Sequence, residues 1–148
     1  MRILGVDIAR RDLSWVVVEG NRRQGEVQAM QKSKLPVPTM YGTPVANLEA
    51  MMKLVAQSVH EAGVQGVAIV KATAGTSAER AKIEFAVELV CHQLGVNCRL
   101  VAPQTISAAK KRKLAQECSP EFEAAIRGVS PKYLTKAAVA AWCVLDVA

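Results

Sequence analysis

The chain has 148 residues, of which 51% are hydrophobic; this fits a single domain, residues 1–148, with one apolar core, and excludes a disordered protein. Aromatic residues make up only 4%, so we expect a core of aliphatic side chains. Lys and Arg number 19 against 13 Asp and Glu, a formal net charge of +6. An excess of positive charge favours phosphate polymers or anionic surfaces as partners.

The sequence shows no pattern for export or for membrane insertion. No segment resembles a signal peptide, and no apolar run is as long as a membrane span, so we expect a cytoplasmic protein without membrane contact. Cys91, Cys98, Cys118 and Cys143 form no CxxC pair, and neither histidine stands at ligand spacing from them. This spacing predicts reduced thiols, with no disulfide and no bound zinc.

The first part of the chain predicts three strands joined by short turns. Residues 2–8 are almost continuously apolar, which is typical of a strand covered on both faces. Residues 14–19 are rich in β-branched side chains, and residues 26–31 alternate weakly, as an edge strand does. The links between these segments have hairpin length, so neighbouring strands should be antiparallel. Residues 32–43 contain two prolines and are predicted to form a loop.

The rest of the chain predicts helices alternating with strands. The expected elements are a helix from Pro44 to Gly63, a strand at 67–70, a helix from a capping box at Thr76 and Glu79 to about Leu94, a strand at 98–101, a helix at 105–117, an irregular stretch at 118–129 and a last helix capped by Ser130 and Pro131. Strands joined by helical crossovers should be parallel. The order predicts an α/β fold: a five-stranded mixed sheet with helices on both faces and the first strand at its centre.

Four segments resemble parts of the RuvC-type Holliday junction resolvases, which have the RNase H-like fold. They are ILGVDIARRDLSWVVVE (residues 3–19), ERAKIEFAVEL (79–89), RLVAPQTISAAKKRK (99–113) and SPKYLTKAAVAAW (130–142). Together they span nearly the whole chain. The resemblance implies an RNase H-like domain with Asp7 at the end of the first strand. It also implies similarity to a divergent bacterial family related to that fold.

The resemblance also implies a catalytic site, but this sequence lacks most of the acidic residues expected there. RNase H-like nucleases use two divalent ions roughly 4 Å apart, held by carboxylates. Asp7 is present, but Lys71 stands where the acid after the fourth strand is expected. Tyr133 and Lys136 stand where two acids are expected on the last helix. A lysine ammonium offers no oxygen ligand and repels a cation. We therefore expect no catalytic site and no metal site, and an ion pair between Asp7 and Lys71 or Lys136.

Other carboxylates are reserve ligands in principle. Asp12, Glu79 and Asp146 are three of them, and Asp146 lies ten residues beyond Lys136, about 15 Å along a helix. Glu84 is the strongest reserve acid, because a helix after the fourth strand can face the open end of the sheet. If Glu84 completes the site with Asp7, Mg²⁺ is the expected cofactor; otherwise none is expected.

A basic run follows the fifth predicted strand. Lys110, Lys111, Arg112 and Lys113 are either a solvated helix face or a set of phosphate contacts. Thr76, Ser77 and Arg80 stand at a helix start, where an anion could bind, although ordinary capping explains them.

Three functions remain open on the sequence. The first is a catalytically degenerate RNase H-like module that binds DNA, RNA or a protein through its basic surface. The second is a divergent metal-dependent nuclease that uses Asp7 with Glu84. The third is a structural or assembly subunit, such as one half of a homodimer that pairs through apolar helix faces.

Overall fold

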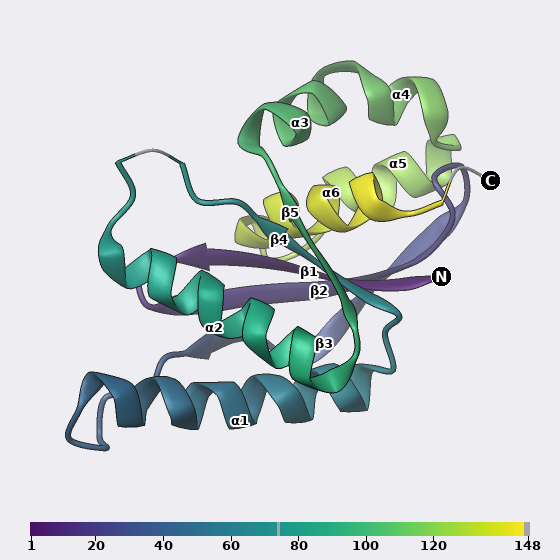
Figure 1. The fold of residues 1–148 in the computed structure, drawn as a ribbon. Helices are drawn as coiled ribbons and strands as arrows, with labels where there is room; N and C mark the ends of the chain where they lie inside the picture. Colours follow the sequence, from purple (N-terminus) through teal and green to yellow (C-terminus); the bar gives the residue numbers. More distant parts are fainter. Residues whose placement is uncertain (74, 147–148) are drawn as a thin grey trace.

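The protein is built on one five-stranded sheet, and its computed structural model describes residues 1–73 and 75–146 (Figure 1). The strands are β1 (Arg2–Ala9), β2 (Asp12–Gly20), β3 (Gly25–Pro36), β4 (Gly66–Val70) and β5 (Asn97–Val101). Their order across the sheet is β3-β2-β1-β4-β5. β2 runs antiparallel to both neighbours, whereas β4 lies parallel to β1 and to β5. The predicted mixed sheet with a central first strand is confirmed.

Helices cover both faces of this sheet, as predicted (Figure 1). One face carries α1 (Pro44–Ala62) and α2 (Ala78–Leu94). The other carries α3 (Pro103–Ala108), η1 (Ala109–Lys113), α4 (Leu114–Glu117), α5 (Pro120–Arg127), η2 (Lys132–Leu134) and α6 (Thr135–Val144). None of the helices in the described ranges is both long enough and apolar enough to span a bilayer.

Side chains alternate between the two faces along the central strand β1, because successive residues of a strand point to opposite sides. Leu4, Val6 and Ile8 pack with α1 and α2. Ile3 packs on the other face, with α6, and Gly5 lies against the same helix. Asp7 continues this second series, so its carboxylate enters the α6 side of the sheet.

The backbone of α6 lies directly on β1 at Gly5. A Cβ on Gly5 would lie 1.9 Å from the Ala137 carbonyl oxygen and 3.1 Å from the Ala141 Cβ. This approach requires both a glycine on the strand and small residues on the helix, which explains the alanines of α6. Ala137, Ala138, Ala140 and Ala141 are fully buried. The contact holds the first turn of α6 close to Asp7, two residues further along β1.

The predicted loop at residues 32–43 is partly wrong, because β3 continues to Pro36. Its pairing with β2 shifts register between Ser14, opposite Lys34, and Val16, opposite Ala29. The extra β3 residues form a bulge, and the indole Nε1 of Trp15 donates a 2.6 Å hydrogen bond to the carbonyl of Lys32 there. A bulge changes the direction of nearby side chains. The weak alternation in the sequence does not predict this change of pairing.

Several predicted helix boundaries also differ. Ser77, and not Thr76, caps α2, since its Oγ accepts from the backbone N–H of Arg80 at 3.2 Å. The stretch 118–129 contains α5, capped by Ser119. α6 begins at Thr135, after the short turn η2, rather than at Ser130 and Pro131.

The predicted single helix at 105–117 is interrupted by a π turn at Ala109–Lys113. The backbone N–H of Leu114 bonds to the Ala109 carbonyl, five residues earlier. Both side chains are fully buried. An ordinary α-helix does not place residues five apart on one face, so the wider turn allows both to reach the core. It also changes the direction of the basic side chains between them.

All four cysteines are free thiols in the structure. Cys91 is buried, and the others are partly buried. Burial raises the pKa of Cys118 to about 11, so this thiol stays protonated and weakly nucleophilic at neutral pH.

We predict that Gly5→Ala lowers the free energy of unfolding by about 3 kcal/mol or more, because α6 must shift to admit one methyl group. The matched control is Ile3→Val, which removes one methyl group on the same face and should cost about 1 kcal/mol. Urea denaturation followed by circular dichroism measures both. A loss for Gly5→Ala no larger than that of the control would contradict the close approach of α6.

Candidate phosphate-binding site

Asp7 pairs with an arginine of α2 at the end of the sheet. The Asp7 Oδ1 lies 3.9 Å from Nη2 of Arg80, and the two side chains are only 15% and 19% exposed. Arg80 also donates to the Val70 carbonyl at 3.1 Å and to the Ile8 carbonyl. It therefore joins the ends of the parallel strands β1 and β4. The predicted pairing of Asp7 with Lys71 or Lys136 is wrong, because Arg80 takes this place.

Two cavities meet at Asp7. The first, of about 640 Å³, is lined by Asp7, Lys110, Leu114, Arg127, Lys132, Tyr133, Thr135, Lys136 and Val139. The second, of about 400 Å³, is lined by Asp7, Val70, Lys71, Thr73, Thr76, Arg80, Pro103, Ile106, Ser107, Lys110 and Lys136. Asp7, Lys110 and Lys136 belong to both. The two cavities are therefore adjoining parts of one site.

The charge of this site is strongly positive. Among the described residues that line the two cavities, Asp7 is the single carboxylate, and six side chains are cationic. The cations are Lys71, Arg80, Lys110, Arg127, Lys132 and Lys136. Asp7 pairs with the largely buried Arg80, and Glu123, outside the lining, pairs with Arg127 at 2.8 Å. The exposed lysines keep their charge available to a ligand.

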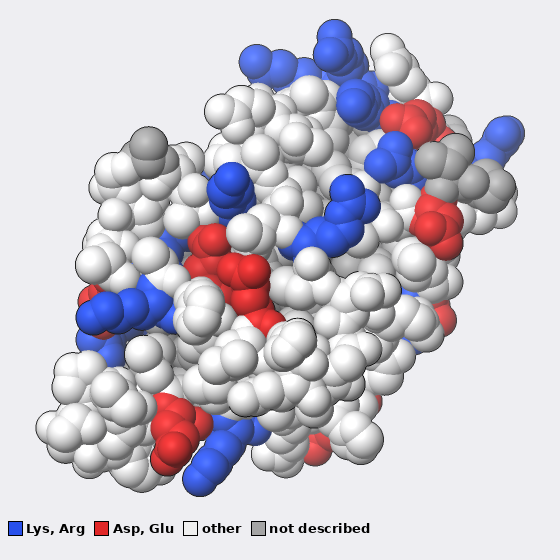
Figure 2. Space-filling model, in the orientation of Figure 1, with Lys and Arg blue, Asp and Glu red and all other residues white. Residues whose placement is uncertain are grey.

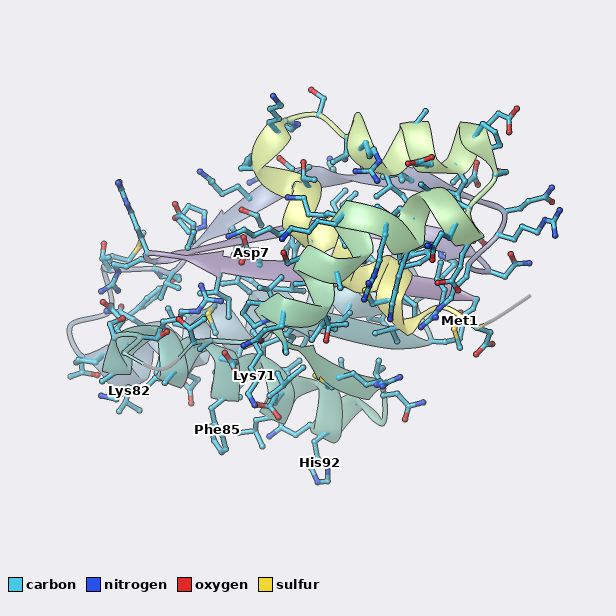
Figure 3. All side chains as sticks on the ribbon, turned by 90° about the horizontal axis from the view of Figure 1, so that it is seen from above. Met1, Asp7, Lys71, Lys82, Phe85 and His92 are labelled. Atoms are coloured by element: carbon cyan, nitrogen blue, oxygen red, sulfur yellow. The ribbon has the colours of Figure 1, made fainter. Side chains whose placement is uncertain are left out.

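The structure brings together most of the residues that the sequence singled out. Lys71 follows β4, Tyr133 lies in η2, and Lys136 lies in the first turn of α6; all three line the site with Asp7. Figure 3 shows Asp7 on β1 and Lys71 at the end of β4.

The basic run does not act as one unit. Lys110 is half-buried and lines both cavities. Lys111, Arg112 and Lys113 are exposed and line neither of them. Within the π turn η1, Lys110 therefore faces the cavities, whereas its three neighbours stay in solvent.

The reserve carboxylates do not join Asp7 in the cavities. Glu84, the predicted reserve acid, is 8% exposed, and its Oε2 accepts a 2.9 Å hydrogen bond from the backbone N–H of Ala72. Asp12 pairs with Lys34 at 3.8 Å, and Glu79 pairs with Arg11. Asp146 lies at the opposite end of β1, where its carbonyl accepts from the Arg22 N–H.

These donors do not fit a pair of magnesium ions. Hard divalent ions need several oxygen ligands, and two of them need bridging or adjacent carboxylates. Within the ranges 1–73 and 75–146, no three Asp, Glu, His or Cys side chains come together in a geometry suited to a metal. The ammonium groups around Asp7 would repel such ions. The same groups suit a ligand with negatively charged oxygens, such as a phosphate.

Three cationic residues of this site were not predicted to belong to it. Arg80 was assigned to a helix start, and its reach across two strand ends depends on tertiary packing. Arg127 donates from Nη2 to the Lys110 carbonyl at 2.8 Å, which fastens α5 to the π turn. Lys132 is the one that the sequence could have indicated, because it stands beside Tyr133 in the SPKYLTK segment.

Comparisons with known proteins show the fold. The structure of RuvC from Thermus thermophilus matches with a TM-score of 0.70 and 18% sequence identity, over 96% of this chain and 92% of that one. RuvC of T. thermophilus in complex with a Holliday junction substrate matches with a TM-score of 0.68 and 18% identity, over 96% and 90%. No protein-family model and no curated protein sequence matches the chain. The predicted RNase H-like, RuvC-type fold is confirmed.

We predict a measurable coupling between Asp7 and Arg80. In a double-mutant cycle with Asp7→Asn and Arg80→Met, the coupling free energy should be about 1 kcal/mol, because the pair is mostly shielded from water. Asp7→Ala should likewise lower stability. Thermal or urea unfolding of the four proteins provides the measurement.

The matched control for this cycle is the pair Arg11 and Glu79, whose side chains are 45% and 49% exposed. Its coupling should be at most about 0.5 kcal/mol, since solvent screens exposed pairs. A coupling at Asp7 and Arg80 as small as that of the control would contradict the structural role of Asp7.

Proposed function

We propose that this chain is a single RNase H-like domain that binds nucleic acid and does not cleave it. The observation that carries the proposal is the reversed charge of the site: six cations and one carboxylate line the two cavities at Asp7. Phosphate is the group that a cluster of Lys and Arg recognises, by charge and by hydrogen bonding. The RuvC structure in complex with a Holliday junction supports a nucleic-acid partner for this fold.

The position of the cations supports a polymer rather than a single small anion. Lys110 and Lys136 line both cavities, so phosphates in adjoining positions would meet the same two lysines. The basic run extends the positive surface outward, and Figure 2 shows Lys and Arg side chains gathered over the end of the molecule that carries α3 and α4. A nucleic-acid strand has regularly spaced phosphates, so it can contact both the cavities and the basic run.

We predict that DNA or RNA binds without sequence preference and that the affinity falls steeply with salt, since released counterions drive such contacts. The double variant Lys110→Gln/Lys136→Gln should lower the affinity about tenfold or more. It should also lower the slope of log affinity against log salt by roughly 2, one for each lost phosphate contact. Fluorescence anisotropy with labelled oligonucleotides at several salt concentrations measures both.

The matched control is Lys111→Gln/Arg112→Gln, which also removes two positive charges but from outside the cavities. This control should lower the affinity and the salt slope less than Lys110→Gln/Lys136→Gln does. Neutralising Lys110, Lys111, Arg112 and Lys113 together should lower both affinity and slope further. Equal losses for the two double variants would assign binding to general surface charge, and no binding by the parent protein at low salt would overturn the proposal.

We predict no cleavage of branched DNA, duplex DNA or RNA–DNA hybrid in Mg²⁺ or Mn²⁺. Two unit charges of like sign 4 Å apart repel by about 4 kcal/mol at an effective dielectric constant of 20. A divalent ion would meet about twice that repulsion from each neighbouring ammonium group. Gel assays of the purified protein over the substrate panel measure cleavage.

The control for contaminating nucleases is Asp7→Ala. Cleavage by the parent protein that disappears in this variant would favour the divergent nuclease, with Mg²⁺ as its cofactor. Cleavage that persists in the variant would come from a contaminant.

Self-association and a cytoplasmic location remain predictions. The apolar face formed by α1 and α2 supports a homodimer, because Phe85 and Val45 are 66% and 77% exposed beside a cavity of about 740 Å³ between these helices. Figure 3 shows Phe85 pointing away from the body of the protein. A two-fold pair would place each Phe85 against the same face of its partner.

A further inference from the structure

The first cavity is more than a cluster of charges. The ring of Tyr133 forms part of its lining, and the fully buried Leu114 and Val139 lie behind the lining. Tyr133 is 37% exposed, so a ligand can reach it. Inorganic phosphate would use the cations and leave the ring of Tyr133 without a contact. A ligand that suits the whole cavity has both an anionic part and a flat apolar part.

The ring of Tyr133 is held in place by two neighbouring residues of β3. Its hydroxyl group shares a 2.7 Å hydrogen bond with the Ser33 Oγ, and the Lys34 Nζ lies 4.7 Å from the ring centroid. Ser33 and Lys34 belong to the bulged part of β3, where the pairing with β2 shifts. The bulge therefore supplies both contacts. A ring that is fixed before a ligand arrives loses little conformational entropy on binding.

We propose that this cavity takes an unpaired nucleotide, with its base stacked on Tyr133 and its phosphate held by Lys110 and Lys136. The inference rests on the proposed function and narrows its ligand to unpaired strands. A volume of about 640 Å³ lies in the range of small-molecule sites, roughly 300 to 1,000 Å³. Any base can stack on an aromatic ring, so this contact needs no particular sequence.

The proposal follows from what a duplex can offer. A paired base in a continuous duplex is stacked on both faces by its neighbours, so it has no free face for Tyr133. Its phosphates remain accessible to the lysines. Single strands, loops and splayed ends would thus gain the stacking contact in addition to the phosphate contacts. The site should prefer them over duplex of the same length.

The test compares a labelled single strand with the same sequence as duplex, by fluorescence anisotropy at one salt concentration. The full chain should bind the single strand about tenfold more tightly, within the range that stacking of one base provides. Tyr133→Leu should lose this preference, so that its affinities for single strand and duplex become similar. Tyr133→Phe should keep the preference, since the ring remains. Tyr41→Leu is the matched control, because Tyr41 is exposed and lies outside the cavity.

A second measurement uses the parent protein alone and does not depend on a folded variant. Thymidine 5′-monophosphate should displace the single strand at roughly tenfold lower concentration than ribose 5-phosphate, which carries the phosphate without a base. Equal competition, or equal affinity of the parent protein for single strand and duplex, would overturn the nucleotide proposal and leave phosphate binding intact. Absence of binding to both would overturn the proposed function itself.

Discussion

The arrangement of the site depends on the contact between the Gly5 backbone and the first turns of α6. A strand and a helix usually pack through their side chains, but here the Ala137 carbonyl lies where a Cβ of residue 5 would be. The distance between β1 and α6 is therefore set by backbone atoms. Asp7 lies two residues beyond Gly5, and Lys136 stands directly before Ala137. Their proximity follows from this one contact.

Arg80 then determines the electrostatic character of the site. It binds the carbonyls that end β1 and β4 and also approaches Asp7. Parallel strands end with carbonyl oxygens at the same edge, and such an edge attracts positive charge. In this chain, an arginine of α2 supplies that charge from within the fold. The exposed lysines at 71 and 136 are consequently left free to meet an anion, which is the basis of the proposed phosphate binding.

The sequence predicts the sheet well because hairpin-length turns and helical crossovers fix the direction and order of strands. It also predicts that Asp7, Lys71, Tyr133 and Lys136 come together, through resemblance to a fold with acids at those positions. It does not predict the π turn at η1 or the bulge in β3. Both arise from tertiary packing: Ala109 and Leu114 must both reach the core, and β3 must change register to stay paired with β2. The role of Arg80 depends in the same way on the spacing of two strand ends.

The two unpredicted irregularities each contain or contact a residue that lines the first cavity. The π turn delivers Lys110, and Arg127 fixes that turn through the Lys110 carbonyl. The bulge delivers Ser33 and Lys34, which fix Tyr133. Each irregularity therefore bears on the lining of the cavity, the first through Lys110 and the second through Tyr133. The π turn and the bulge thus both act on the cavity where binding is proposed. The regularly paired strands of the central sheet hold the π turn and the bulge in fixed positions.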